Sequence, residues 1–350
     1  MKIDFRVQYL FIVVFLCFLC YNIVMRSFAF WYEGKDSVKE NLEAVLNFNL
    51  WSECGWEDKN SVLDIGFKIK NLASANELFF FCPFKVEIGN IDDLGCKFDK
   101  AELLCALFNE DYTSTSEQGT KFIDVRSKNN STTLFFIYKL DKEQNIEISD
   151  FTGGGIIKIK TEAISSTSKE KDVYFRFRIH GIKLGDLIHQ YSASKKGVQE
   201  LFNQTYLLDF RYNNIRSLPP SLIEEMSKPQ NSIVSITKLH FLFMTKAYID
   251  VNTSMSFPKK TRKLETSIWK NYVDNKDTED IVAYQFSFSK ESNNSESLPI
   301  DNAELFLKYS AQKSVAPKYI CFTILLGVLG SILGSGIIYL LKLLPIFKNL

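Results

Sequence analysis

The sequence predicts a mainly β protein in which a β-sandwich-like domain, residues 26–318, lies between two transmembrane helices. Two long apolar segments, residues 9–25 and 319–341, flank that domain. The chain has 30 phenylalanines and 15 tyrosines but only 16 glycines, and aromatic residues favour strands. Roughly ten short segments alternate apolar with polar residues, which is the period of a half-buried strand. Many short strands with few helices are typical of a β-sandwich.

The last apolar segment, residues 319–341, contains no charged residue and has a lysine at each end. A helix of this length spans the hydrocarbon core of a bilayer, which is about 30 Å thick. Gly327, Gly330 and Gly334 fall close together on this helix, and the last two form a GxxxG pattern. That spacing predicts close packing against a second helix, although glycine is common in membrane helices in general.

The first apolar segment has two interpretations, a cleaved signal peptide or an uncleaved transmembrane anchor. Residues 9–25 are apolar apart from Asn22, and no A-x-A cleavage pattern follows them. The segment is also long for the apolar region of a signal peptide, so an uncleaved anchor fits better. The aromatic side chains just after it are then expected to form an interfacial belt: Phe28, Phe30, Trp31 and Tyr32.

The orientation is indicated by N-glycosylation sequons rather than by charge. Five sequons lie between the two spans, at Asn129, Asn130, Asn203, Asn252 and Asn293. They favour a lumenal central domain, with residues 1–8 and 342–350 as short cytosolic tails. Four cysteines of this domain are candidates for two disulfides, with three possible pairings: Cys54, Cys82, Cys96 and Cys105.

The order of elements within the domain follows from the alternation. A short amphipathic helix is expected at residues 36–46, and a second one after Pro219 and Pro220, at residues 221–227. Two polar segments, residues 165–171 and 289–296, are expected to form exposed loops. The three glycines at residues 153–155 are expected to form a tight turn. Strands are expected at residues 62–70, 78–82, 133–140, 155–160, 173–182, 239–251, 281–288 and 305–309.

The clearest strand places Phe175, Phe177 and Ile179 on one face and basic residues on the other. Arg176, Arg178 and Lys183 have two interpretations, a basic stripe for an acidic partner or, as the preferred one, a solvated strand face. Asp92 and Asp93 are likewise expected in solvent.

No sequence pattern indicates catalysis. The net charge of +1 does not favour nucleic acid, and three histidines leave few options for zinc or acid–base chemistry. HExxH, P-loop and G-x-S-x-G patterns are absent from the sequence. We therefore expect a protein that is not an enzyme and carries no cofactor or metal.

Four segments in the second half of the chain, in order, resemble one known family. They are Val173-Tyr-Phe-Arg-Phe-Arg-Ile-His-Gly-Ile-Lys-Leu-Gly-Asp186, residues 239–248, Tyr284-Gln-Phe-Ser-Phe-Ser289 and Leu305-Phe-Leu-Lys-Tyr309. Together with the glycine-containing last span, these residues, about 172–341, resemble the ERGIC/Erv family of ER–Golgi vesicle proteins. Leu184-Gly185 lacks the Ser-Phe that precedes this glycine in the family, and the family's lumenal CxxC cluster is missing.

The resemblance implies a two-span protein that cycles between the ER, the ER–Golgi intermediate compartment and the Golgi, with both termini cytosolic. It also implies a non-catalytic cargo receptor that pairs with a related two-span subunit and binds vesicle coat proteins and lumenal cargo. Ile346 and Phe347 of the C-terminal tail are then candidates for a coat-sorting signal, or they are simply membrane-flanking residues.

Two other classes share the two-span layout. The lumenal β-subunit of a lipid-flippase P-type ATPase also has a lumenal β-domain with cysteine pairs, but usually a longer cytosolic N-terminal segment. A trimeric two-span ligand-gated channel needs more lumenal disulfides than four cysteines allow. The flippase subunit is therefore the alternative to the trafficking receptor.

Overall fold

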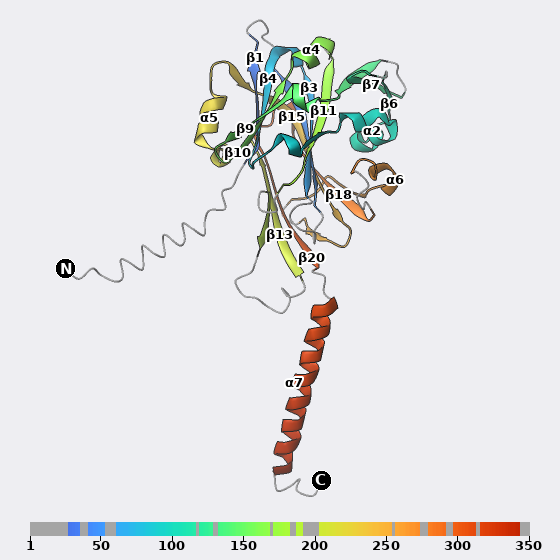
Figure 1. Ribbon diagram of the computed structural model, residues 1–350, viewed down its shortest axis with the longest axis vertical. Helices are drawn as coiled ribbons and strands as arrows, with labels where there is room; N and C mark the ends of the chain where they lie inside the picture. The colour runs from blue at the N-terminus through green and yellow to red at the C-terminus, as the bar shows by residue number, and fades with distance from the viewer. Residues whose placement is uncertain are drawn as a thin grey trace, which may run out of the picture.

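The computed structural model has a mainly β domain followed by one long helix, α7 (Figure 1). It describes residues 27–35, 41–52, 61–116, 119–128, 132–168, 171–182, 187–191, 203–253, 256–273, 279–291, 297–312 and 316–343. The strands of these residues form three sheets of five, eleven and four strands.

The five-stranded sheet is antiparallel throughout, in the order β14-β1-β4-β10-β9. Its strands are β14 (Asn231–Ile233), β1 (Ala29–Gly34), β4 (Ala75–Cys82), β10 (Gly154–Lys160) and β9 (Ile146–Phe151). The four-stranded sheet has the order β12-β13-β20-β16, with β12 (Ile188–Tyr191), β13 (Asn203–Tyr212), β20 (Ala303–Gln312) and β16 (Asp250–Asn252).

The eleven-stranded sheet has the order β17-β18-β15-β2-β3-β11-β8-β7-β6, with β19 beside β18 and β5 beside β11. The pairs β15–β2 and β11–β8 are parallel, and the others are antiparallel. The strands are β17 (Lys260–Lys263), β18 (Ile281–Glu291), β15 (Ser235–Lys246), β2 (Glu43–Trp51), β3 (Val62–Lys70), β11 (Asp172–Ile179), β8 (Thr133–Tyr138), β7 (Phe122–Ser127), β6 (Tyr112–Thr115), β19 (Ser297–Leu298) and β5 (Ile91–Asp93).

Short helices lie between the strands. They are α2 (Ala101–Phe108), α3 (Lys142–Asn145), α4 (Glu162–Ser168), α5 (Pro220–Met226), α6 (Thr266–Trp269) and the 3₁₀ turns η1 (Leu72–Ser74), η2 (Ile88–Asn90), η3 (Gly95–Asp99) and η5 (Ile215–Ser217). Helix α7 (Ala316–Leu343) ends the described chain.

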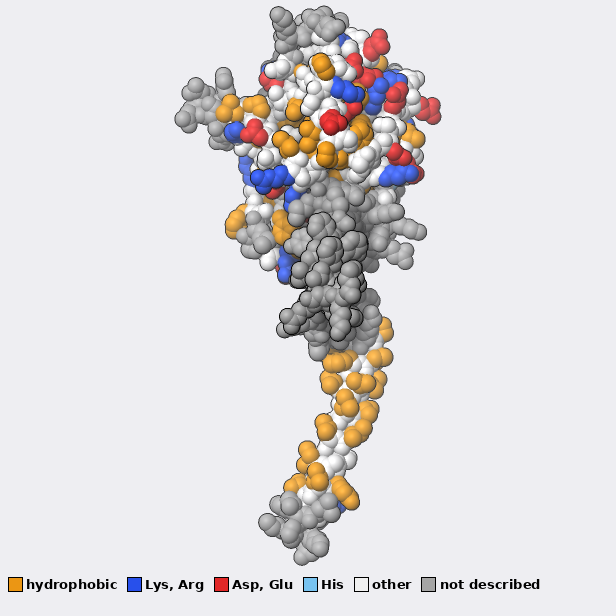
Figure 2. Space-filling model, turned by 90° about the vertical axis from the view of Figure 1, so that its left-hand side faces the viewer, with side chains coloured by type: hydrophobic (Ala, Val, Ile, Leu, Met, Phe, Trp, Pro, Cys, Tyr) orange, Lys and Arg blue, Asp and Glu red, His pale blue; other side chains and the backbone are white. Residues whose placement is uncertain are grey.

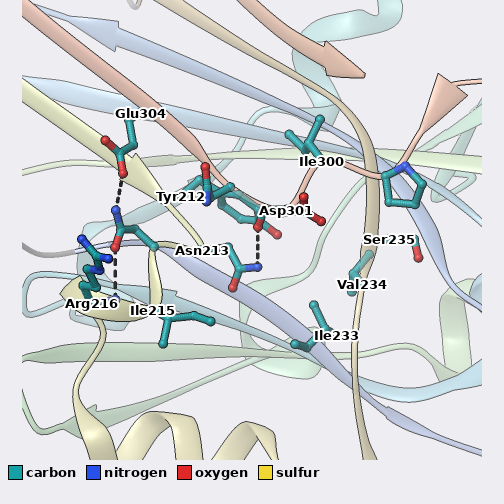
Figure 3. Close-up of a pocket in the computed structure, with 13 residues that line it drawn as sticks. Tyr212, Asn213, Ile215, Arg216, Ile233, Val234, Ser235, Ile300, Asp301 and Glu304 are labelled. Atoms are coloured by element: carbon teal, nitrogen blue, oxygen red, sulfur yellow. Dashed lines mark hydrogen bonds between the residues drawn. The ribbon is translucent and has the colours of Figure 1, made fainter. Parts of the chain in front are cut away.

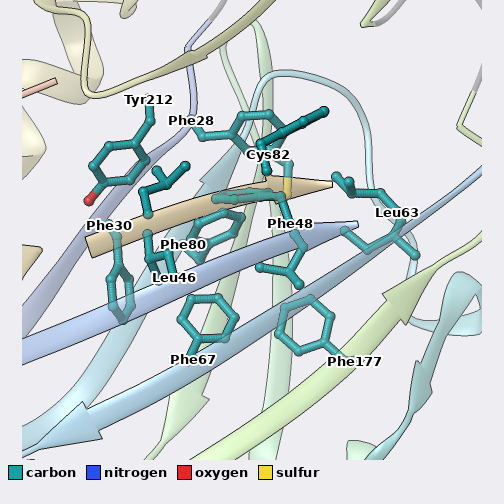
Figure 4. Close-up of a cluster of buried hydrophobic side chains, with 14 of the residues drawn as sticks. Phe28, Phe30, Leu46, Phe48, Leu63, Phe67, Phe80, Cys82, Phe177 and Tyr212 are labelled. Carbon is teal, nitrogen blue, oxygen red and sulfur yellow. The ribbon is translucent and has the colours of Figure 1, made fainter. Parts of the chain in front are cut away.

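The main core lies where the three sheets face one another. Alternation along β2, β3 and β11 directs Phe48, Phe67 and Phe177 to the same face, where they meet Phe30 and Phe80 of the five-stranded sheet (Figure 4). The rings of Phe67 and Phe80 pack edge to face with centroids 5.3 Å apart. A two-residue period therefore builds one aromatic core that holds the sheets together.

Two smaller clusters cover the outer faces of the sheets. Helices α2 and α6 pack on the large sheet through a second cluster that includes Phe98, Leu104 and Trp269. Helix α5 packs Leu222 on the outer face of the five-stranded sheet, against Trp31. The described part of the domain is thus a stack of sheets with a helix layer on either side.

Most of the predicted elements are confirmed. Residues 62–70 form β3, and the other seven predicted strands overlap β4, β8, β10, β11, β15 with β16, β18 and β20. Helix α5 follows Pro219 as expected, and Gly153 has a φ of 83° in the turn before β10. Three local predictions are wrong. Residues 43–46 begin β2, where Ala44 and Leu46 alternate into the core, and residues 165–168 belong to α4. Residues 289–291 of the expected loop 289–296 extend β18, where they pair with β15 and β19.

The expected aromatic belt is also wrong as a membrane feature. Phe28, Phe30 and Tyr32 belong to the main core, and Trp31 lies beneath α5, so all four are buried. Both faces of β1 are covered, and a strand buried on both faces reads as a continuous apolar run. The aromatic run at residues 28–32 therefore indicates a strand in the centre of a sheet rather than a membrane interface.

Among the described residues, α7 is the one helix long and apolar enough to cross a membrane. Its residues Tyr319–Lys342 have a mean hydropathy of 2.2, and none of this window is buried. The helix lies apart from the domain (Figure 1). Residues 9–25, the first predicted span, lie outside the described residues.

Candidate binding site

A pocket of about 620 Å³ lies where β13 ends, β20 begins and the chain crosses from β14 to β15. Figure 3 shows side chains from these three places converging on it. The lining residues are Tyr212, Asn213, Asn214, Ile215, Arg216, Ile233, Val234, Ser235, Pro299, Ile300, Asp301, Asn302 and Glu304.

One edge of β1 brings the walls together. The backbone N–H of Phe28 donates to Arg211 (2.9 Å), and that of Asn213 donates back to Phe28 (2.8 Å). Further along the same edge, the N–H of Val234 donates to Phe30 at 3.4 Å. The end of β13 and the start of the crossover therefore lie beside successive residues of one strand, and the pocket lies between them.

A turn at Asn213 closes the site. This residue has a φ of 51°, a left-handed conformation that asparagine adopts more readily than most residues. Its side-chain amide donates to the carbonyl of Asp301 at 2.8 Å, which joins the two loops (Figure 3). The pocket walls are thus fixed to each other by a hydrogen bond as well as by the sheet.

The lining combines exposed aliphatic side chains with a buried hydroxyl. Ile215 and Ile233 are 68% and 54% exposed, while Tyr212 is 1% exposed. The Tyr212 hydroxyl has no hydrogen-bond partner among the described residues, and burial raises its pKa, so it is a protonated donor. Figure 2 shows a side of the domain on which hydrophobic side chains gather between scattered charges.

The charges around the pocket are balanced. Asp301 pairs with Lys290 at 3.2 Å, and the Glu304 carboxylate accepts from the Asn214 amide. Arg216, whose side chain is exposed, adds a second positive charge. A balanced set of donors and acceptors beside apolar surface suits a dipolar ligand better than a strongly charged one.

A second polar cluster lies on the helix-facing side of the large sheet, and it overturns the expectation of a solvated face. Arg176 and Arg178 are buried beneath η3 and α6 rather than in solvent. Arg178 donates to both oxygens of Asp64, at 2.6 and 3.0 Å, and Arg176 donates to the Tyr272 hydroxyl at 2.7 Å. Lys183 lies outside the described residues.

Asp64 is the single carboxylate that the two arginines of this cluster share. It also accepts from the Tyr272 hydroxyl and the Trp51 indole, both at 2.8 Å. Burial alone would raise the pKa of Asp64, but the charge and hydrogen bond of Arg178, the charge of Arg176 and the Trp51 bond outweigh it and hold that pKa below its usual value. The cluster is closed to solvent and crosslinks sheet to helices, so we assign it a structural role.

The expectation for Asp92 and Asp93 holds for the first residue only. Asp92 is exposed and lies 2.6 Å from Nε2 of His180. Asp93 is largely enclosed: burial raises its pKa to about 6, although it accepts backbone hydrogen bonds from Gly95, Leu140 and Cys96.

The predicted modification sites are only partly described. Asn252 is exposed in β16, and Asn203 begins β13, whereas Asn129, Asn130 and Asn293 lie outside the described residues. Cys82 is buried, Cys96 exposed and Cys105 half-buried, and these three thiols are free, so none is bonded to another. Cys54 lies outside the described residues, as do Ile346 and Phe347.

The predicted helix-packing residues lie in α7. A Cβ added at Gly327, Gly330 or Gly334 would meet no atom within 4 Å. These positions are therefore not covered by any other described element of the chain. Among the described residues, no group of three or more His, Cys, Asp or Glu side chains is arranged to hold a metal ion.

The fold and the pocket define a mainly β domain joined to one membrane-spanning helix candidate. No protein-family model matches the chain, and no curated protein matches it either. The pocket is not predictable from the sequence, because its walls come from loops far apart in the chain. The Asn213-Asn214 pair is a composition typical of a turn, but it does not indicate which other loops meet there.

Proposed function

We propose that this protein is a non-catalytic receptor subunit that binds other proteins through its lumenal β domain during ER–Golgi transport. The observation that carries the proposal is the pocket of exposed isoleucines and a buried, unpartnered hydroxyl on a domain that is tethered to a membrane helix. Such a mixed lining is typical of recognition sites.

The tether is short. Only residues 313–315 separate Gln312, the last residue of β20, from Ala316, the first of α7. At no more than about 3.6 Å per residue, this link spans roughly 14 Å. The domain is therefore held at the membrane surface, where a receptor for vesicle loading has to act.

The family resemblance supports the trafficking assignment. The four segments that carry it fall on β11, β15, β18 and β20, and α7 follows them in the same order. The five sequons support a lumenal domain. The proposed partners are a related two-span subunit, vesicle coat proteins and lumenal cargo.

The test is affinity purification of the tagged full chain from mildly solubilised membranes, followed by mass spectrometry. We expect a second two-span protein of similar size together with coat components or lumenal ER residents. The control is α7 carrying the same tag, which removes partners held by the helix alone. Recovery of a large multi-span ATPase instead would replace this proposal with the flippase subunit.

A further inference from the structure

We infer that the pocket binds an extended peptide, which pairs with the outer edge of β14 and places an aliphatic side chain against Ile215 and Ile233. This inference rests on the proposed function and names the chemistry of the bound partner. Three features of the pocket point to it: a free strand edge, an apolar seat and a buried donor.

The free edge is at Ile233. Among the described residues, strand β14 is the last strand of its sheet and pairs only with β1. The N–H of Gly34 donates to Gln230, and the N–H of Val234 donates to Phe30, so the even-numbered positions face β1. Because backbone groups alternate along a strand, the N–H and C=O of Ile233 point to the outer edge, where an added strand would pair.

The apolar seat flanks this edge. Ile233 and Ile215 are both more than half exposed, and they lie on opposite walls of the pocket (Figure 3). Ile300 lies on a third wall, across the pocket from them (Figure 3), where its N–H donates to the carbonyl of Ile236 at 2.8 Å. An aliphatic side chain from a peptide would pack against Ile215 and Ile233, and specificity in strand addition comes from such side-chain contacts.

The buried donor is Tyr212. A buried hydroxyl without a partner destabilises a fold, and most buried polar groups in native proteins have a hydrogen-bond partner. This hydroxyl is closed to solvent, so a carbonyl oxygen of a bound peptide supplies the missing acceptor after the side chains that cover Tyr212 move aside. The balanced charges of Arg216, Lys290, Asp301 and Glu304 favour a peptide backbone over a phosphate or a nucleic acid.

The position of the pocket favours a soluble peptide over a lipid. The pocket includes the start of β20 near Ala303, whereas α7 follows the other end of this strand, at Gln312. Ten strand residues cover about 33 Å, and Figure 1 shows β20 running toward α7. The pocket is therefore at the end of the strand that is remote from the membrane.

The experiment measures fluorescence anisotropy of a labelled peptide with the purified full chain in detergent micelles. The probe is an acetylated peptide of alternating threonine and valine with a central isoleucine. Two matched peptides carry a central glycine or an N-methylated central isoleucine. We expect each change to weaken binding by about tenfold, because one removes the aliphatic side chain and the other a backbone donor.

Variants of the chain test the same contacts from the protein side. Tyr212→Phe removes only the hydroxyl, and we expect about tenfold weaker binding with unfolding stability unchanged or raised. Ile233→Asp should weaken binding similarly, whereas Ile88→Asp, at another exposed isoleucine that lies outside the pocket, should leave it unchanged.

Equal binding of all three peptides, or of wild type and Tyr212→Phe, would overturn the inference. The outcome is separable from that of the proposed function. If the peptides fail to bind while the co-purifying proteins remain trafficking components, only the peptide site is wrong. If the peptides bind but an ATPase co-purifies, the site stands and the trafficking role is wrong.

Discussion

At the scale of single residues, the chain places one carboxylate between two arginines in a site without solvent. Asp64 accepts from Arg178, Tyr272 and Trp51, and Arg176 lies 3.8 Å away. Attraction is strong in a medium of low polarity, but so is the penalty for removing one partner. Loss of the Asp64 carboxylate would leave the buried guanidinium groups of Arg176 and Arg178 without a counter-charge.

Asp64→Asn should destabilise the protein by about 3–5 kcal/mol, because it leaves two buried guanidinium groups without a carboxylate. Chemical denaturation of the full chain in micelles measures this loss. The control is Asp99→Asn, which breaks an ion pair with Lys139 at a half-exposed site and should change stability by less than about 1 kcal/mol. Similar losses for the two variants would contradict the structural role.

The pH dependence of this contribution has a definite sign. Because the folded-state pKa of Asp64 is lowered, its stabilisation is present above the ordinary value of 3.8. It is lost as the pH falls below 3.8 through the folded-state pKa. Asp64→Asn should not show this acid-dependent loss.

Asp93 predicts the opposite trend near neutrality. Its folded-state pKa of about 6 is raised above the ordinary 3.8, so its contribution is full below pH 3.8 and is lost as the pH rises through 6. At about 1.4 kcal/mol per pKa unit, the loss is at most about 3 kcal/mol. Denaturation of wild type and Asp93→Asn between pH 4 and pH 7 should show this loss in wild type alone. If the stability of wild type and of Asp93→Asn changed with pH in the same way, a group other than Asp93 would be responsible.

At the scale of elements, period-two alternation was enough to predict the core face of β11 but not what covers its other face. Phe175, Phe177 and Ile179 point into the core as expected. Arg176 and Arg178 have the pattern of a solvated face, yet Trp269 and Tyr272 close over them from another part of the chain. A pattern within one strand contains no information about a helix that packs there by tertiary contact.

The packing of β3 against its neighbour β11 depends on Gly66. The Tyr174 hydroxyl of β11 occupies the space that a side chain at position 66 would need. A Cβ at Gly66 would lie 2.3 Å from the Tyr174 hydroxyl and 3.0 Å from the Arg176 guanidinium. Gly66→Ala should therefore destabilise the protein by about 1–3 kcal/mol. Gly89→Ala, where the added Cβ meets nothing within 4 Å, is the matched control in thermal unfolding. A neutral Gly66→Ala would mean that the strand shifts freely.

A second prediction at the scale of elements concerns the glycines of helix α7. A Cβ at Gly330 or Gly334 meets no atom of another described element within 4 Å, so leucine there should leave the domain folded and weaken association with a neighbouring helix. Co-purification with the partner in mild detergent measures the effect. Ile332→Phe adds bulk on another face of the same helix and should leave the association intact. Unchanged recovery of the partner with both glycine variants would exclude this face.

At the scale of the whole molecule, the N-glycosylation sequons test the membrane topology, because glycans are added only to lumenal segments. If residues 26–318 are lumenal, the protein should lose mass on treatment with N-glycosidase. Gel mobility or intact mass before and after treatment is the measurement, and Asn252→Gln tests the described, exposed site separately. An unchanged mass would refute the lumenal assignment. The pocket could not be predicted at this scale, since Tyr212, Ile233 and Ile300 meet only once three sheets are assembled.

The short connection from β20 to α7 also decides how the domain responds to tension. A pull from the membrane enters at Gln312 and acts along β20, whose ten residues pair in register with β13. The load is therefore parallel to the strands and falls on the whole ladder of hydrogen bonds at once, in shear. The pocket residues lie at the end of β20 opposite Gln312, so the whole ladder shares the load with them. If α7 spans a membrane, a pull on it therefore opens the pocket end of β20 only when the β13–β20 ladder as a whole gives way.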